Sequence, residues 1–342
     1  MTNLCIPQPY LLFLGDTTCA LDAKTAFGLR DWARERCIGE YALPTSTVTT
    51  SLPRLTPAQA KAEGARSLVI GVAPTGGVIA PAWVPALVEA LEAGLDLVSG
   101  MHTRLEDVPQ LNSAAARLGR QLINIRQPPT GLSVGTGRKR TGKRLLTVGT
   151  DCALGKKYTA LTLTREFKKR GVDTDFRATG QTGILIGGGG IPIDSVVADF
   201  VAGAAETLSP DAAFNHWDVV EGQGSIFHPS YSGVSLGLLH GTQPDVIVMC
   251  HELGRDWILD VENYPTPSVA EAIELTLALA RRTNRQVRCA GVSLNTSMLD
   301  AAKGRAVLAE YSEQLHLPVA DPVRGGPELD RLVEACLTGS AP

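Results

Sequence analysis

Residues 144–156 read RLLTVGTDCALGK, and this stretch indicates the fold of the surrounding chain. An apolar run that ends at Val148 leads into a turn bounded by Gly149 and Gly155, and Lys156 begins a helical pattern. A glycine-bounded turn between a strand and a helix directs backbone N–H groups and the positive end of the helix toward one point. With a lysine at the helix start, this arrangement favours a cradle for a phosphate group.

Apolar runs and amphipathic stretches alternate along the rest of the chain, which is typical of parallel, doubly wound sheets. Strands are predicted at residues 10–15, 67–73, 95–100, 144–149, 172–177, 217–221, 245–250, 287–295 and 317–320. Helices are predicted at residues 81–93, 156–170, 195–208, 268–282 and 300–316. We therefore expect an α/β protein.

A segment rich in proline, glycine and basic residues interrupts this alternation. Residues 128–143 read PPTGLSVGTGRKRTGK and are predicted to form a linker. An N-terminal Rossmann-like α/β domain is then expected over residues 1–127 and a larger α/β domain over residues 144–342. The basic residues favour a solvated linker, and the alternative is an arm that folds over a polyphosphate.

The composition excludes several other classes of protein. The 342 residues are 44% hydrophobic and 20% charged, which allows a buried core and is unlike a disordered chain. A formal net charge of −3 gives no general attraction to nucleic acid or to an anionic membrane, and no apolar run approaches the roughly 20 residues of a membrane span. The seven cysteines are widely spaced, so we expect a reducing cytoplasm and neither a disulfide framework nor a zinc site.

Two later strand ends carry residues suited to the same cradle. WDVVEGQGS, residues 217–225, ends an apolar run with Glu221 before a glycine-rich turn, and VRCAGVSLNTS, residues 287–297, brings Asn295 to another strand end. In a doubly wound sheet, such ends lie beside the first strand–helix turn, where ligands bind. The amide of Asn295 is suited to reading the edge of a purine.

The motifs GTDCALGK, VEGQG and SLNTS resemble dethiobiotin synthetase and its relatives in the P-loop superfamily. The resemblance implies a C-terminal doubly wound domain of the P-loop NTPase type, with Lys156 on phosphate, Glu221 at a metal or the reacting centre, and Asn295 on adenine. The chain departs from the superfamily at Lys157, which replaces a metal-binding hydroxyl. Because an ammonium group cannot ligate Mg²⁺, we expect no Mg²⁺ and assign no metal ligand.

A second resemblance covers nearly the whole chain. It rests on LGDTTCALDAKTAFGL, SGMHTRLEDVPQL, GTDCALGKKYTALTL, TGQTGILIGGGGIPIDSV, VVEGQGSIFHPSYSGVSLGLLHG and PDVIVMCHELGR. These stretches are similar to a bacterial family long classed as a domain of unknown function, whose characterised member is a D-glutamate N-acetyltransferase. The resemblance implies transfer of an acetyl group from acetyl-CoA to the amine of a D-amino acid. Coenzyme A carries an adenine and a diphosphate, so a nucleotide cradle suits it.

This interpretation assigns expected roles to particular residues. Acetyl-CoA is expected to contact Gly149, Thr150, Asp151, Cys152, Ala153, Leu154, Gly155, Lys156, Lys157, Tyr158, Thr159, Gln181, Thr182 and Asn295. The substrate is expected to contact His102, His228, Glu252 and Arg255, where the alternative for Arg255 is an ion pair with Asp256 or Asp260. The expected catalytic residues are Lys156, Glu221 and His251, with Glu221 or His251 as the base that deprotonates the amine.

Gln181 and Thr182 belong to TGQTGILIGGGG, residues 179–190. This stretch is too rich in glycine to be packed throughout, so it is predicted to form a loop, either flexible at the surface or shaped to let the backbone approach the pantetheine arm.

Two other functions remain open from the sequence alone. One is an ATP- and Mg²⁺-dependent ligase or kinase of the dethiobiotin synthetase type, and the other is a non-catalytic nucleotide-binding sensor. In every case we expect a cytoplasmic homo-oligomer that binds small molecules and neither nucleic acid nor membrane.

Overall fold

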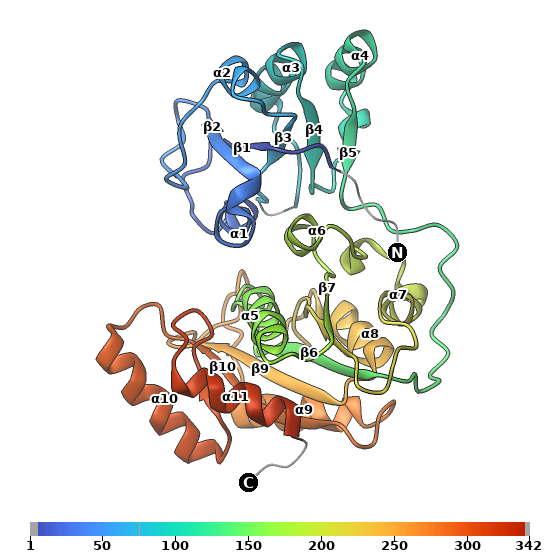
Figure 1. Ribbon diagram of the computed structural model, residues 1–342, viewed down its shortest axis with the longest axis vertical. Coiled ribbons are helices and arrows are strands. Elements are labelled where there is room, and N and C mark those ends of the chain that lie inside the picture. The colour runs from blue at the N-terminus through green and yellow to red at the C-terminus, as the bar shows by residue number, and fades with distance from the viewer. Residues whose placement is uncertain (1–5, 75, 339–342) are drawn as a thin grey trace. The chain divides into compact units, whose positions relative to one another are not determined.

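The computed structural model describes residues 6–74 and 76–338 and contains two parallel sheets (Figure 1). The first sheet has the strand order β2-β1-β3-β4-β5, and the second has the order β11-β10-β9-β6-β8-β7. All neighbouring strands pair in parallel. The predicted α/β class, with a Rossmann-like N-terminal part and a doubly wound C-terminal part, is confirmed.

The strands of the first sheet are β1 (Tyr10–Gly15), β2 (Cys37–Ala42), β3 (Ser67–Ile70), β4 (Asp96–Ser99) and β5 (Leu122–Asn124). Those of the second sheet are β6 (Lys143–Gly149), β7 (Thr174–Arg177), β8 (Trp217–Val220), β9 (Val246–Glu252), β10 (Arg288–Asn295) and β11 (Val319–Ala320). The α-helices are α1 (Lys24–Trp32), α2 (Pro57–Ala62), α3 (Val84–Glu92), α4 (Pro109–Leu118), α5 (Lys156–Lys169), α6 (Gln181–Gly187), α7 (Val201–Leu208), α8 (Ser232–Thr242), α9 (Val269–Ala280), α10 (Ala301–Leu315) and α11 (Pro327–Thr338). Single-turn 3₁₀ helices span Arg34–Arg36, Pro81–Trp83, Leu105–Asp107, Ile193–Ser195 and Ala198–Phe200. Among the described residues, no helix has the length and apolar character needed to cross a membrane.

The described chain divides into two compact units, and each unit is made of separate stretches of the sequence. The first unit contains residues up to Pro128 together with residues 180–192, and the second contains residues 129–179 and 193 onward. Helix α6 therefore belongs to the first unit, where it packs on α1. The Thr182 and Thr25 hydroxyls lie 2.9 Å apart, and the Gln181 amide donates to Thr25 at 3.2 Å.

The prediction of a loop over residues 179–190 is wrong for its central part. Residues Gln181–Gly187 form α6, and most of its residues are buried. The helix ends at Gly188, which adopts a left-handed φ of 76°, a conformation that glycine enters without strain. The glycines that suggested a loop are compatible with a short helix because it is stabilised by packing within its unit.

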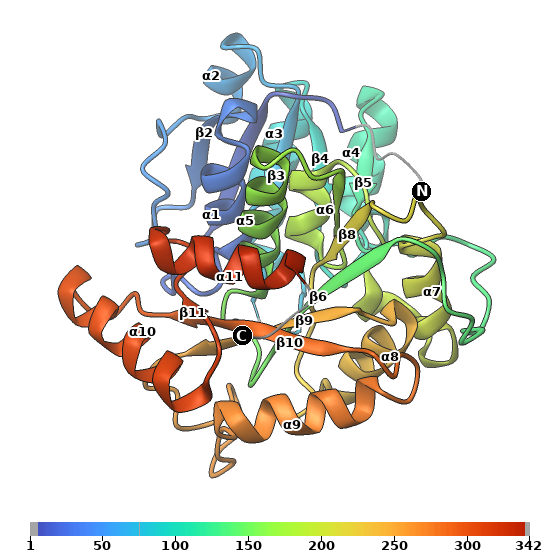
Figure 2. The same cartoon turned by 60° about the horizontal axis from the view of Figure 1, so that its bottom comes forward.

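The second sheet is covered on both faces, as its apolar strands require. One core joins the sheet to α5 and α11 through Leu163, Phe167 and Leu332, and the other joins it to α9 and α10 through Ala272 and Leu308. Figure 2 shows α9 on the opposite side of the sheet from α5 and α11. Residues at the carboxyl ends of β6, β8 and β9, which are neighbours in this sheet, are left to line a ligand site.

The predicted linker over residues 128–143 has no helix or strand before β6, and most of its residues are exposed, but Arg140 packs on the second unit. The alternative of an arm over a polyphosphate stays a prediction. Arg140 is 5% exposed, and its guanidinium donates to backbone carbonyls at the ends of two helices. One nitrogen, Nη1, bonds Ala205 and Glu206 of α7 and the following Ser209, and the other, Nη2, bonds Gly241 and Thr242 of α8. The last carbonyls of a helix lack partners within the helix and carry partial negative charge, so one cation satisfies both helix ends.

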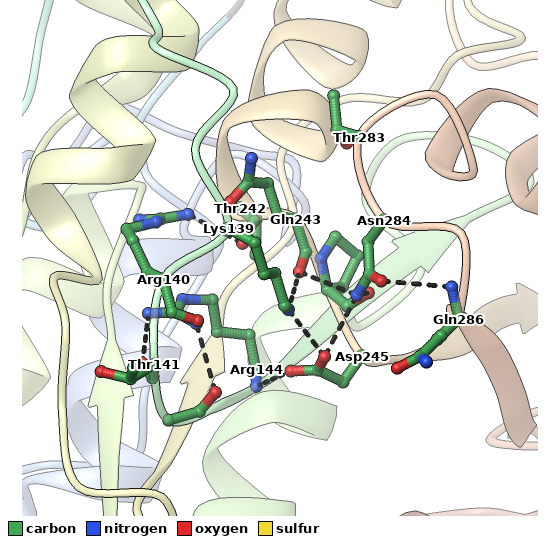
Figure 3. A network of polar contacts seen from close by, with 12 residues as sticks. Lys139, Arg140, Thr141, Arg144, Thr242, Gln243, Asp245, Thr283, Asn284 and Gln286 are labelled. Carbon is green, nitrogen blue, oxygen red and sulfur yellow. Dashed lines mark hydrogen bonds and ion pairs between the residues drawn. The ribbon is translucent and has the colours of Figure 1, made fainter.

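Neighbouring residues fix this segment further, as Figure 3 shows. Lys139 donates to Asp245 at 2.7 Å and to the carbonyl of Gln243 at 3.1 Å, and Asn284 donates to Asp245 at 3.1 Å. Burial lowers the pKa of Arg140 to about 10, with the charge of Arg144 acting in the same direction. Arg140 is therefore still charged at neutral pH.

A charge cluster at the amino-terminal ends of β7 and β8 predicts a pH-dependent stability. Burial alone would lower the pKa of His216, but hydrogen bonds to Asp173 at 2.9 Å and Asp218 at 3.2 Å raise it, and Asp175 and the Arg177 guanidinium complete the cluster. A raised pKa means that protonated His216 stabilises the fold below its unfolded-state pKa of about 6.5 and loses that contribution as the pH rises through the folded-state value.

We therefore expect His216→Asn to destabilise the protein more at pH 6 than at pH 8.5. Urea unfolding of the two proteins across this range measures the difference. A difference that is constant or that grows with pH would contradict the assignment.

Candidate functional site

The loop between β6 and α5 closes around Lys156. Two residues of this loop adopt left-handed backbone conformations, Ala153 with φ 55° and Gly155 with φ 104°. The Lys156 side chain is 7% exposed, and its Nζ donates to the backbone carbonyl of Asp151 at 2.7 Å. Burial lowers the pKa of Lys156, against the raising influence of Cys152, Cys250 and Asp151. The lysine thus lies inside the loop, beside the start of α5.

Glu221 follows β8 and is 4% exposed. Its Oε2 accepts a hydrogen bond from the backbone N–H of Thr179 at 3.0 Å, and the Thr179 hydroxyl donates to the Glu221 carbonyl at 2.7 Å. The next residue, Gly222, donates its N–H to the Thr147 hydroxyl at 3.0 Å. These contacts hold the turn that follows β8 against Thr147 of β6 and against Thr179.

Only glycine fits at position 222. A Cβ atom there would lie 1.8 Å from the Thr147 carbonyl oxygen and 3.0 Å from Cδ of Lys156. The turn after Glu221 and the Lys156 side chain are therefore in direct contact.

His251 stands on the other side of the loop, near the end of β9. Its Nδ1 lies 2.9 Å from the Thr150 hydroxyl, and the Thr150 N–H donates to the carbonyl of Cys250 at 3.1 Å. Burial lowers the pKa of His251, a shift that the charge of Glu252 opposes. The structure brings the three predicted catalytic residues, Lys156, Glu221 and His251, to the ends of adjacent strands.

A small cavity adjoins Lys156 and the turn after Glu221. Its enclosed part has room for little more than one water molecule, and it opens to solvent. Its lining includes Leu146, Val148, Ile226, Leu238, Leu239 and Ser235. The lining is mixed, because Lys156, Thr147, Gln223, Ser225 and Thr276 also contribute to it. The pocket therefore suits a small group that has both apolar and polar atoms.

Arg255 forms an ion pair with Asp151 of this loop. Asp151 is fully buried, and its Oδ2 accepts from Arg255 at 3.1 Å and from the Leu259 N–H at 2.8 Å. Arg255 also pairs with Glu252. Its ion-pair partners are therefore Asp151 and Glu252, and the alternative of a pair with Asp256 or Asp260 is wrong.

Asn295 is engaged by its neighbours. Its amide donates to Glu252 at 3.1 Å, and its carbonyl oxygen accepts from the Ser297 N–H at 3.0 Å. A contact with adenine stays a prediction and requires at least one of these bonds to open. The substrate contacts of Glu252 and Arg255 are likewise still predictions.

Thr159, two residues after Lys157, uses its hydroxyl within the fold. The Lys157 ammonium lies 5.4 Å from the centre of the Tyr158 ring. The Thr159 hydroxyl donates to the Gly155 carbonyl at 3.1 Å and lies 2.7 Å from the hydroxyl of Ser293 in the sheet. Thr159 therefore points into the fold and away from the loop.

Three predicted contact residues lie in the first unit. His102 Nε2 is 2.7 Å from Nη1 of Arg126, whose Nε donates to Gln181 at 2.7 Å, and Gln181 and Thr182 both contact Thr25. Sequence reasoning missed Arg126 because it missed the short strand β5, which ends two residues earlier. The short apolar run of β5 is the signal that could have placed Arg126 after a strand end.

His228 lies in the loop that follows the Glu221 turn and is 3% exposed. Its Nε2 is 3.0 Å from the carbonyl of Leu259, and its Nδ1 accepts from the Ser230 N–H at 3.1 Å. These contacts indicate the neutral tautomer that carries its proton on Nε2.

Comparisons with known proteins also give two domains, although the model of the second domain runs through residues 180–192. Residues 133–333 match the family model described as a domain of unknown function (DUF1611_C) P-loop domain, and residues 35–128 match the model described as the DUF1611_N Rossmann-like domain. Two curated relatives are 47% identical to the chain, and both are named D-glutamate N-acetyltransferase. The Pseudoalteromonas protein matches over 94% of this chain and 97% of its own, and the Tritonibacter scottomollicae protein over 96% and 98%. The crystal structure of a DUF1611 family protein from Anabaena variabilis superposes with a TM-score of 0.88 at 32% identity, covering 96% of this chain and 99% of the other.

Proposed function

The chain belongs to the DUF1611 family, and on that basis we propose that it is an N-acetyltransferase that moves the acetyl group of acetyl-CoA to the amine of D-glutamate or a similar D-amino acid. The names of the two curated relatives support the reaction and the acceptor. The observation that carries the proposal is that Lys156 and the turn after Glu221 line one small cavity, with His251 at the end of the neighbouring strand β9. Acyl transfer to an amine needs a base and donors for an oxyanion at the same place.

Only one end of an acetyl-CoA molecule, either the thioester or the diphosphate, can lie beside Lys156. The pantetheine arm separates the thioester from the diphosphate, whereas Lys156 and the turn after Glu221 are in contact. A diphosphate needs an open, cationic surface, but Lys156 is 7% exposed and the cavity beside it is small. We therefore place the acetyl end of the thioester here, with its methyl group toward the cavity.

The reaction then follows from the groups present. The amine nitrogen attacks the thioester carbon, the new C–N bond forms as the C–S bond breaks, and coenzyme A leaves as its thiolate. Glu221 or His251 accepts the proton that the amine loses. Lys156 and backbone N–H groups of residues 223–225 stabilise the oxyanion.

A thiol-release assay with a panel of D- and L-amino acids tests the proposal. We expect coenzyme A release with D-glutamate that exceeds release with L-glutamate, and mass spectrometry should identify the N-acetyl product. Phosphate release from ATP under the same conditions, without acetyl transfer, would replace the proposal with the ligase or kinase function.

Added Mg²⁺ is expected to leave the rate of coenzyme A release unchanged. Lys157 occupies the position of the metal-binding hydroxyl, and Thr159 uses its own hydroxyl within the fold. Rates measured across a Mg²⁺ titration check this expectation. A rate that rises in proportion to Mg²⁺ occupancy would show that the metal acts on the donor.

A further inference from the structure

We propose that Asp151, Cys152 and His228 bind a divalent transition-metal ion, with Zn²⁺ as the expected occupant. This proposal revises the expectation of no zinc site that followed from the spacing of the cysteines. Spacing failed as a guide because the ligands come from two distant segments, the β6–α5 loop and the loop that follows β8. Neither the family match nor the relatives' names assign a metal here.

The geometry brings one ligand atom from each residue together. These three atoms all lie within 4.8 Å of one another. Asp151 is 0% exposed, and its Oδ1 has no hydrogen-bond partner among the residues that the structure describes. A buried carboxylate oxygen without a partner is costly. A cation bound at this cluster would satisfy it.

The donor set is one that zinc prefers. A thiolate, an imidazole nitrogen and a carboxylate oxygen are the usual zinc ligands, and three protein ligands leave a fourth position open for water or substrate. His228 has its Nε2 hydrogen-bonded to the carbonyl of Leu259, as metal-binding histidines commonly do with the nitrogen that faces away from the metal. Its Nδ1 accepts from the Ser230 N–H, and this hydrogen bond gives way when Nδ1 binds the metal.

The local charges permit a dication. Two basic side chains stand nearby: the Lys156 amine donates to the carbonyl of Asp151, and Arg255 donates to its Oδ2. Glu252 pairs with Arg255. A metal-bound Cys152 would be a thiolate, whose negative charge adds to that of Asp151.

A second cluster of possible ligands serves as the comparison. Asp175, His216 and Asp218 also bring ligand atoms within 4.8 Å of one another. Here Arg177 donates to Asp218 Oδ1 at 2.5 Å, and the hydroxyl of Ser209 donates to the other oxygen at 2.5 Å. Because its ligand atoms are already paired, we expect this cluster to bind no metal.

The test is the metal content of the full-length protein. After incubation with Zn²⁺ and gel filtration, atomic emission should find one zinc ion per chain in the wild type and in the matched control His216→Asn. Cys152→Ser and His228→Asn should each weaken zinc binding by more than the roughly 10–100-fold that loss of an outer-shell partner costs. Circular dichroism of each variant establishes that it has folded.

A second measurement uses the wild type alone and so does not depend on variant folding. Co²⁺ added in place of Zn²⁺ should give a thiolate-to-cobalt charge-transfer band in the near ultraviolet, because Cys152 ligates the ion. Substoichiometric zinc in the wild type, or a cobalt spectrum without the thiolate band, would overturn the proposal. So would equal zinc binding by wild type and Cys152→Ser. None of these readouts requires acetyl transfer, so they fail or succeed independently of the proposed function.

Discussion

Glu221→Gln is expected to lower kcat for acetyl transfer by roughly 10²–10⁴, the usual range for loss of a general base, and to change the affinity for acetyl-CoA only a few-fold. The amine of a free amino acid has a pKa near the α-amino and lysine reference values, so it arrives mostly as ammonium and must lose a proton. Glutamine keeps the shape of Glu221 and an oxygen that can accept from the Thr179 N–H, but it cannot take that proton. Steady-state rates and acetyl-CoA titrations of both proteins measure the two quantities.

His251→Asn is the matched comparison, since His251 flanks the same loop through Thr150. We expect it to cost less in kcat than Glu221→Gln. The opposite order would exchange the roles of the two residues. If Glu221→Gln instead weakens acetyl-CoA binding and keeps kcat, the diphosphate lies at Lys156 and the thioester reacts elsewhere.

Arg140→Met is expected to destabilise the second unit by about 3–5 kcal/mol, the range for removing one partner of a buried, charge-assisted network. The substitution keeps an apolar side chain of similar length, but it leaves carbonyls at the ends of α7 and α8 without a donor. Urea unfolding followed by tryptophan fluorescence measures the loss, because Trp217 lies in the core of this unit. The effect is expected although Arg140 lies in the segment that the composition predicts to be a linker.

Arg138→Met, two residues away, is the control. Its guanidinium is 68% exposed and pairs with Asp211 at the surface, so stability should stay near that of the wild type. Arg140→Lys should recover only part of the loss, since one ammonium cannot span two helix ends as the planar guanidinium does. Equal stabilities for Arg138→Met and Arg140→Met would contradict the double-capping role.

The sequence was informative where local pattern decides structure. The apolar run before Gly149 and the helical pattern after Gly155 sufficed to predict β6, the loop and α5, and the second sheet follows its predicted strands closely. A predicted strand end also indicates at which edge of the sheet its residues lie. The expectation that Glu221 and His251 lie at the same edge of the sheet as the loop of Lys156 needed only the rule that parallel strands end at one edge.

The same reasoning failed where a distant partner decides structure. Residues 179–190 have the composition of a loop, yet Gln181–Gly187 form a helix. Residues 128–142 do lack helix and strand, but the composition did not predict that Arg140 is buried against two helices. The local sequence does not indicate to which carbonyls Arg140 donates or on which helix α6 packs. The cluster of Asp151, Cys152 and His228 was missed for a related reason, since its members were weighed one at a time and the chain brings them together only on folding.

The return of residues 180–192 to the first unit has a consequence for biosynthesis. A ribosome releases the chain from its N-terminus, so the strands of the first sheet emerge well before α6 does. Until residue 192 has left the exit tunnel, Thr25 and Arg126 lack the contacts that Gln181 and Thr182 give them. By then β6, α5 and β7 have also been released. The first unit, although encoded first, therefore completes its folding only after translation of the second has begun.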